Sequence, residues 1–114
     1  SEVYMEKEKI IYDKAIRDKI PEIIEATGKR ATVEVADKQT FNRYLEEKLG
    51  EELEEYLKEG HIEELADLVE VIYGLLELNG VTIEEFEAIR IKKAEVRGGF
   101  SKRLVLKEVS DREV

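Results

Sequence analysis

Residues 38–80 read KQTFNRYLEEKLGEELEEYLKEGHIEELADLVEVIYGLLELNG, and this stretch sets the class of fold. Apolar side chains recur along it at the spacing of an α-helix. Two stop signals divide it, Gly60 in the middle and Asn79-Gly80 at the end. The pattern therefore predicts two long helices, of about 38–58 and 62–78. Because a short connection makes consecutive helices antiparallel, we expect a helical hairpin at the centre of the fold.

Local boundary signals mark the ends of these and the neighbouring helices. Asp37 is a candidate N-cap for the first long helix. Pro21 suits the first turn of a shorter helix, and Gly28 suits its end. Thr82-Ile83-Glu84-Glu85 is a capping box that predicts a third long helix of about 83–97.

Two further segments have the composition of strands. Residues 31–36 alternate with a period of two and contain β-branched side chains, which predicts a short strand, and residues 104–109 are its expected partner. The predicted fold is mainly α, with a helical hairpin assembling into a multi-helix bundle by oligomerisation and with a minor β element. A length of 114 residues is that of one domain, so we expect a single domain over 1–114.

Composition excludes several classes of function. The chain has no cysteine and a single histidine, which excludes disulfides, thiolate zinc sites, cysteine nucleophiles and a multi-histidine metal site within one chain. Its net charge of −9 argues against a nucleic-acid partner and a polybasic membrane anchor. The apolar runs are too short to span a membrane. Ser1–Tyr4 lacks the apolar start of a secretion signal, so we expect a cytoplasmic protein.

Four of the 28 acidic residues interrupt the apolar faces of the two long helices. They are Glu52 and Glu55 on the first helix, and Glu64 and Asp67 on the second. Burying a carboxylate costs several kcal/mol unless a partner compensates it, and four on facing helices repel one another. A hard divalent cation with oxygen ligands, Mg²⁺ or Mn²⁺, supplies that compensation.

A second interpretation needs no metal. The same carboxylates either pair with Lys48, Lys92 or Lys93, or lie at the wet end of the hairpin. His61, at the turn between the helices, is assigned no role, because a lone turn histidine is most often solvated.

The same acids carry a resemblance to a known family. Residues 51–55 (EELEE) and 63–68 (EELADL) resemble the EExxE…ExxD signature of the all-α nucleoside triphosphate pyrophosphohydrolases, which include the MazG type. The short gap between them, with residues 12–21 (YDKAIRDKIP) and 93–100 (KAEVRGGF), is similar to the phosphoribosyl-ATP pyrophosphohydrolase-like branch. The resemblance covers roughly residues 10–108.

The resemblance implies a Mg²⁺-dependent enzyme that cleaves the α–β phosphate bond of a nucleotide and releases pyrophosphate and a monophosphate. It also implies a homodimer or homotetramer. Carried over by position, the metal ligands are Glu52, Glu55, Glu64 and Asp67, with Glu52 and Glu55 also catalytic. Glu51 and Glu63 match neighbouring acids of the motif.

The phosphates of such a substrate need cations. The candidates for binding them are Lys48, Arg17, Lys19, Lys93 and Arg97. Surface charge is the simpler interpretation of Arg17 and Lys19. The rival hypothesis for the whole chain is a non-enzymatic helical oligomerisation or regulatory module that retains the fold, and metal binding discriminates between the two.

Overall fold

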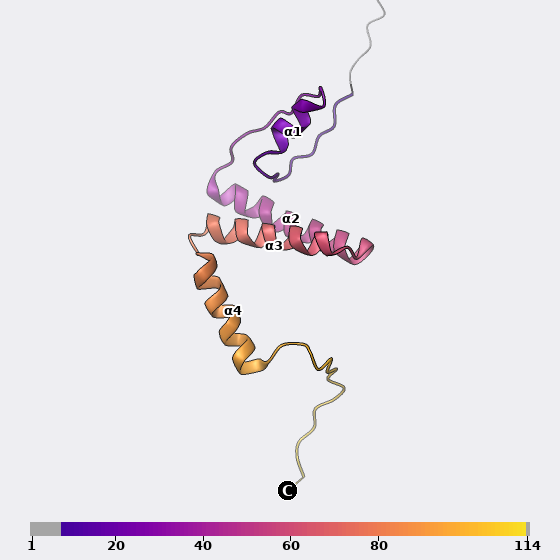
Figure 1. Ribbon diagram of the computed structural model, residues 1–114, viewed down its shortest axis with the longest axis vertical. Helices are drawn as coiled ribbons and strands as arrows, with labels where there is room; N and C mark the ends of the chain where they lie inside the picture. The colour runs from indigo at the N-terminus through magenta and orange to yellow at the C-terminus, as the bar shows by residue number, and fades with distance from the viewer. Residues whose placement is uncertain (1–7, 114) are drawn as a thin grey trace, which may run out of the picture. The chain divides into compact units, whose positions relative to one another are not determined.

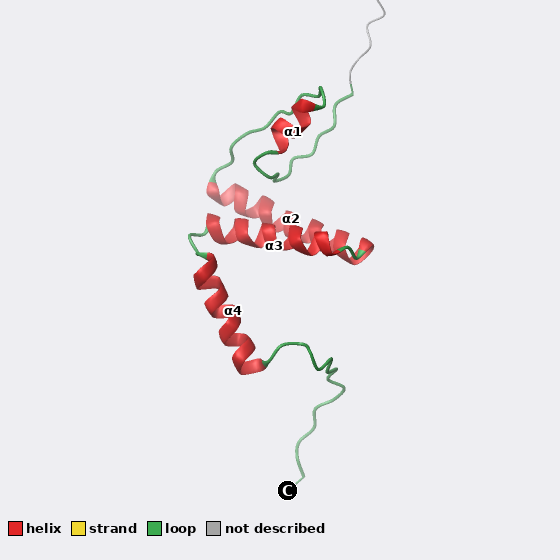
Figure 2. Ribbon diagram, viewed as in Figure 1, coloured by secondary structure: helices red, strands yellow, loops and turns green. Residues whose placement is uncertain are grey.

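The computed structural model describes residues 8–113; residues 1–7 and 114, and with them the expectation about Ser1–Tyr4, lie outside the described part. Four helices follow one another along it (Figure 2). They are α1 (Ile20–Ala26), α2 (Lys38–Glu59), α3 (Ile62–Leu78) and α4 (Ile83–Arg97). The expected mainly α fold is confirmed. The bounds of the three long helices agree with the predicted ones to within one residue.

The described residues divide into two compact units, 8–80 and 81–113, and each is described by itself. The expectation of a single domain stays a prediction. The first unit contains α1, α2 and α3, and the second contains α4. No helix in the described range is long and apolar enough to cross a membrane.

The centre of the first unit is the predicted hairpin, in which α2 and α3 run side by side in opposite directions (Figure 1). Asp37 begins α2, because its Oδ1 accepts the Thr40 N–H at 2.8 Å. Gly60 ends it in the left-handed conformation, with φ of 71°. At the other end of the hairpin, the Asn79 amide donates to the Asn42 side chain at 3.0 Å. Local caps and one cross-helix hydrogen bond therefore fix both ends.

The core of the hairpin is small. Its buried apolar residues are Ala15, Leu45 and Val71, and no side chain in residues 8–113 is completely buried. Partly buried apolar side chains pack around these three: Phe41, Tyr44, Leu49, Leu75 and Leu78. All of these except Ala15 belong to α2 or α3, so the two helices of the hairpin supply most of the core. Ala15 comes from the segment before α1, so this segment is part of the core.

The expected minor β element is wrong. Residues 31–36 and 104–109 have no regular secondary structure, and no strand occurs within residues 8–113. Val33 and Val35 are 57% and 100% exposed. An alternating pattern describes a half-buried strand only when a partner strand and a core are available to it. Segment 31–36 finds neither within its own unit.

The second unit is built on α4. Thr82 caps this helix by accepting the Glu85 N–H at 3.1 Å, which is the hydroxyl half of the predicted capping box. Gly98, with φ of 82°, ends it. No residue of α4 is buried, so its apolar side chains gain little from packing.

Candidate functional site

Glu52 is the feature that sets this hairpin apart from an ordinary pair of amphipathic helices. It lies in the middle of α2 and only 8% of it is exposed, about as little as Leu45. Its Oε2 is buried and has no hydrogen-bond partner. Its Oε1 lies 3.6 Å from Lys48 Nζ, one helical turn earlier. A single lysine at that distance does not satisfy a buried carboxylate, because two oxygens need several donors.

Two further carboxylates act on Glu52. Burial raises the pKa of Glu52, the negative charge of Glu55 raises it further, Lys48 partly offsets this, and Asp67 on α3 raises it again. Glu55 and Asp67 thus contribute from both helices of the hairpin. Three of the four predicted carboxylates are therefore coupled through their charges, without lying within 4.8 Å of one another as a group, and we call them the acidic triad: Glu52, Glu55 and Asp67.

The members of the acidic triad differ in their surroundings. Glu55 is exposed, in contrast to the buried Glu52. The Asp67 side chain is 42% exposed, and its Oδ1 accepts a hydrogen bond of 2.7 Å from Arg17 Nη2. Of the triad, Glu52 is therefore buried, while Glu55 and Asp67 are accessible to solvent.

Glu64, the fourth predicted ligand, is buried but holds the beginning of α3. Its Oε1 accepts the His61 N–H at 2.9 Å, the hydrogen bond of a capping box. Its charge is not among those that shift the pKa of Glu52. The helical wheel correctly placed Glu64 on a buried face, but the structure does not bring it into the triad.

A different group surrounds Glu64. The side chains of Glu59, His61 and Glu64 place one possible ligand atom each within 4.8 Å of one another, the only such group of three among the described residues. His61 Nδ1 lies 3.7 Å from Glu59 and 3.8 Å from Glu64. The sequence analysis assigned neither Glu59 nor His61 a role. The sequence signal that could have identified this group is the spacing Glu59-x-His61-x-x-Glu64 across the turn between α2 and α3.

The predicted phosphate-binding cations are distributed over both units. Lys48 and Arg17 belong to the first unit and already pair with triad members. Lys19 is exposed and directly precedes α1. Lys93 and Arg97 lie on α4 and line, with Ile89, Lys92 and Val96, a shallow hollow on that helix. Within the first unit, the pair of Lys48 with Glu52 matches the interpretation in which Lys48 compensates an acid, whereas Arg17, which pairs with Asp67, was not among the partners that this interpretation named.

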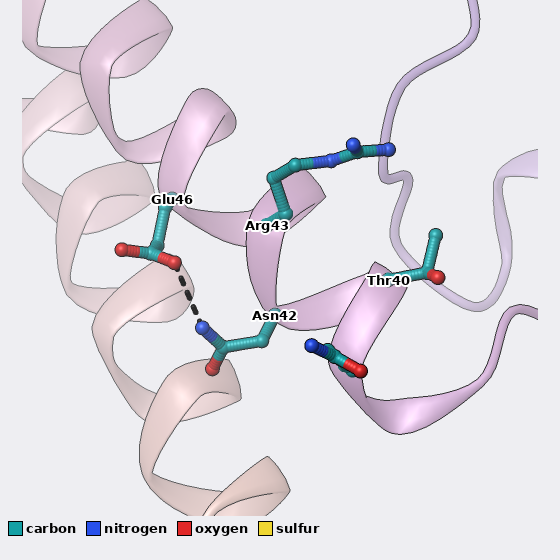
Figure 3. A pocket seen from close by; sticks show the side chains of 5 residues that line it. Thr40, Asn42, Arg43 and Glu46 are labelled. Atoms are coloured by element: carbon teal, nitrogen blue, oxygen red, sulfur yellow. Dashed lines mark hydrogen bonds between the residues drawn. The ribbon is translucent and has the colours of Figure 1, made fainter.

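A second hollow lies beside the first half of α2 and is polar (Figure 3). It is lined by Gln39, Thr40, Asn42, Arg43 and Glu46. The Asn42 amide donates to Glu46 at 2.8 Å, and Arg43 points away from this pair. It contains none of the triad residues, and the triad therefore lies outside it.

The triad has the type of ligand that a hard divalent cation prefers, but its three carboxylates do not place their oxygens within 4.8 Å of one another, so they do not form a ready site for one ion. All its side chains offer carboxylate oxygens, which Mg²⁺ and Mn²⁺ prefer, and one buried oxygen lacks any partner. Burial is the main cause of the raised pKa of Glu52, and a cation held here would oppose only the added repulsion from Glu55 and Asp67. Lys48 and Arg17 supply only part of this compensation, since each contacts a single oxygen of its partner.

Compared with family models, curated proteins and solved structures, the chain gives no match. What the protein does is therefore inferred from its own residues and their geometry.

Proposed function

We propose that the protein is a metal-dependent nucleotide pyrophosphohydrolase. The observation that carries the proposal is the buried carboxylate of Glu52, whose Oε2 has no partner and which stands next to two more acids. Such an arrangement destabilises a protein unless something compensates it. The resemblance of residues 51–55 and 63–68 to the EExxE…ExxD signature favours a catalytic metal ion as the compensating partner.

In this proposal the acidic triad binds Mg²⁺ or Mn²⁺. When bound, the ion supplies polarisation of the phosphoryl oxygens and a lowered pKa for a coordinated water. Glu55, the exposed member, is assigned the role of the general base that accepts a proton from water, and its exposure supports this assignment. Glu64 is assigned as the fourth ligand from the sequence motif alone. In the structure its Oε1 accepts a hydrogen bond from the His61 N–H.

The substrate class follows from the phosphate chemistry and not from any base-binding feature. The substrate is a nucleoside triphosphate or phosphoribosyl-ATP, cleaved between the α- and β-phosphates. Of the five predicted phosphate-binding cations, Lys48 and Arg17 are in ion pairs with the triad, and Lys19, Lys93 and Arg97 remain assignments from sequence position.

A homodimer or homotetramer belongs to the same proposal. Only three apolar residues are buried within residues 8–113, while α3 exposes 74% of Ile62, 36% of Leu65 and 43% of Val69. A chain with so small a core gains stability by burying such a face against another copy. The same observation favours the rival function, a non-enzymatic oligomerisation or regulatory module, so self-association does not discriminate between the two.

The deciding experiment measures pyrophosphate release. Purified protein with Mg²⁺ is offered canonical nucleoside triphosphates and deoxynucleoside triphosphates, oxidised and deaminated analogues, and phosphoribosyl-ATP. We expect release with at least one substrate, and loss of release in Glu52→Gln. Glu47→Gln, the same change at an exposed position of α2, is the matched control and should keep the activity.

Two results count against the proposal. Equal release by wild type and Glu52→Gln places the activity outside the acidic triad. If folded protein whose binding of Mg²⁺ has been measured releases pyrophosphate from no substrate of the panel, the oligomerisation module is favoured.

A further inference from the structure

A histidine and two glutamates meet at the turn of the hairpin, outside the acidic triad. Glu59 is the last residue of α2, His61 precedes α3, and Glu64 lies in the first turn of α3. Each offers one possible ligand atom, and these atoms lie within 4.8 Å of one another. Gly60, in the left-handed conformation, turns the chain between the first two of them. The turn therefore gathers three potential metal ligands from a short stretch of chain.

The separations between these atoms are close to those of ligands around one zinc ion. His61 Nδ1 lies 3.7 Å from Glu59 Oε2 and 3.8 Å from Glu64 Oε1. Nitrogen and oxygen ligands of a tetrahedral zinc ion, each about 2.0–2.1 Å from the metal, lie roughly 3.3 Å from one another. Both distances from His61 therefore need to shorten by only about half an ångström. The side chains of Glu59 and His61 are exposed and free to make this adjustment.

Glu64 is the buried member of this group and is incompletely paired. Only 9% of its side chain is exposed. Its Oε1 accepts the His61 N–H at 2.9 Å, and among the described residues no other hydrogen bond reaches its carboxylate. One N–H does not satisfy the two oxygens of a buried carboxylate, which have room for several donors. A cation at the turn supplies the missing partner.

The group has no permanent positive charge of its own. Within the described part of the first unit, the ion pairs of lysine and arginine go to other acids: Glu51, Glu52 and Asp67. The ion-pair partner of Glu59 and Glu64 is His61, which carries a charge only when it is protonated. A neutral imidazole instead presents a nitrogen lone pair, the form in which histidine binds a metal.

We propose that Glu59, His61 and Glu64 bind one divalent transition-metal ion of the zinc type. An imidazole nitrogen favours such an ion over Mg²⁺, which prefers oxygen ligands and keeps several of its waters. Three protein ligands leave a coordination position for water, and no thiolate is required. The ion links the end of α2 to the beginning of α3 and so stabilises the turn of the hairpin.

This inference does not rest on the proposed function and concerns a different ion at a different place. Glu64 is the residue that both proposals assign to a metal. In the structure its ligand atom lies with those of Glu59 and His61, and its charge is not among those that act on Glu52. Variants of His61 and Glu59 therefore test the turn site without altering the acidic triad.

The first test measures binding of Zn²⁺ by isothermal titration calorimetry, with the whole chain, without a histidine tag, in excess Mg²⁺. We expect one Zn²⁺ per chain, because Mg²⁺ competes poorly for a site with an imidazole ligand. His61→Gln removes the nitrogen ligand but keeps the backbone N–H that Glu64 accepts. It should raise the Kd for Zn²⁺ at least about tenfold, since even the loss of a group that only orients a ligand costs that much.

The glutamate variants separate a ligand from a surface charge. Glu59→Gln should also weaken Zn²⁺ binding. Glu54→Gln, the same change at an exposed position of α2 outside the group, should change the Kd by no more than about twofold, because distant surface charges are screened. Glu52→Gln should bind Zn²⁺ as the wild type does, so failure of this inference and failure of the proposed function appear in different variants.

Thermal unfolding gives a second readout. At a Zn²⁺ concentration ten times Kd, the Tm of the wild type should rise by about 5 °C or more, because the ion binds the native state. His61→Gln should show no comparable rise. Its metal-free Tm, compared with that of the wild type, shows separately whether the substitution itself changes folding.

Other outcomes overturn the inference. It fails if the wild type binds no Zn²⁺, or if His61→Gln binds it as tightly as the wild type. If Glu54→Gln weakens binding as much as Glu59→Gln, net charge explains the affinity. If excess Mg²⁺ abolishes the binding of Zn²⁺, the site is one for hard cations and not of the zinc type.

Discussion

Replacing Glu52 by glutamine should make the metal-free protein more stable. The change keeps the shape of the side chain but removes a buried charge that Glu55 and Asp67 repel and that Lys48 only partly offsets. A buried polar group without a partner costs about 1–3 kcal/mol. Because glutamine satisfies its own polar atoms incompletely at the same place, we expect a gain near the lower end, about 1 kcal/mol. For a unit of this size that raises Tm by about 5 °C.

The same substitution should remove the response to metal. At a Mg²⁺ concentration ten times Kd, a cation bound only to the native wild type stabilises it by about 1.4 kcal/mol. Glu52→Gln loses a ligand and should lose this shift. The assay is thermal unfolding followed by circular dichroism, with and without Mg²⁺, at one protein concentration. Glu52→Gln thus moves the metal-free Tm up and the metal-induced shift towards zero.

Glu47→Gln is the matched control, since Glu47 is an exposed acid of the same helix. It should change stability by no more than about 0.5 kcal/mol and keep the Mg²⁺ shift. The reasoning is refuted if Glu52→Gln melts below the wild type without metal, because the carboxylate is then well compensated. It is refuted as well if both variants keep the full Mg²⁺ shift.

Three more outcomes are expected. The pKa of Glu52 is raised above its ordinary 4.5, so just above pH 4.5 the folded state holds a proton that the unfolded chain has lost. The stability of the wild type relative to Glu52→Gln should therefore fall as pH rises above 4.5. Urea unfolding at a series of pH values measures this difference. Leu45→Ala should cost about 2–5 kcal/mol in the same assay, since Leu45 is 7% exposed in a very small core. Two glycines should respond with opposite signs in thermal unfolding. Gly74→Ala should stabilise α3 by up to about 1 kcal/mol, because its new methyl group meets Leu45 at an ordinary 3.5 Å, while Gly60→Ala should destabilise by about 1 kcal/mol, since φ there is 71°. The first expectation is contradicted if the stabilities of wild type and Glu52→Gln change in parallel with pH. The second is contradicted if Leu45→Ala leaves the stability unchanged, and the third if both glycine variants change the stability in the same direction.

Much of the fold could be predicted because helix ends are local. Asp37 and Thr82 cap their helices through a hydrogen bond to the residue three positions ahead, and Gly60 ends α2 within one turn. The strand predicted at 31–36 failed for the opposite reason. Its pattern described the strand alone, whereas a strand exists only with a partner that the sequence pattern does not specify.

The candidate site divides in the same way. Periodicity selected Glu52 and Glu64 as acids on buried faces, and both are buried. It did not separate their roles: Glu52 lies in the hairpin with an unpartnered oxygen, while Glu64 caps α3 through the His61 N–H. The difference depends on which way each side chain turns, and residue spacing carries no information on that.

The order and bounds of the three long helices, and the face on which Glu52 lies, follow from the sequence by itself, because their causes act within a few residues along one chain. The exposure of Glu55, the effect of the Asp67 charge on Glu52 and the ion pair between Arg17 and Asp67, fifty residues apart, were decided only by the tertiary structure. Each of these depends on how α3 and the segment before α1 pack against α2. Such packing is a balance of many small contacts between distant residues, whereas a helix boundary needs only one local hydrogen bond or one glycine.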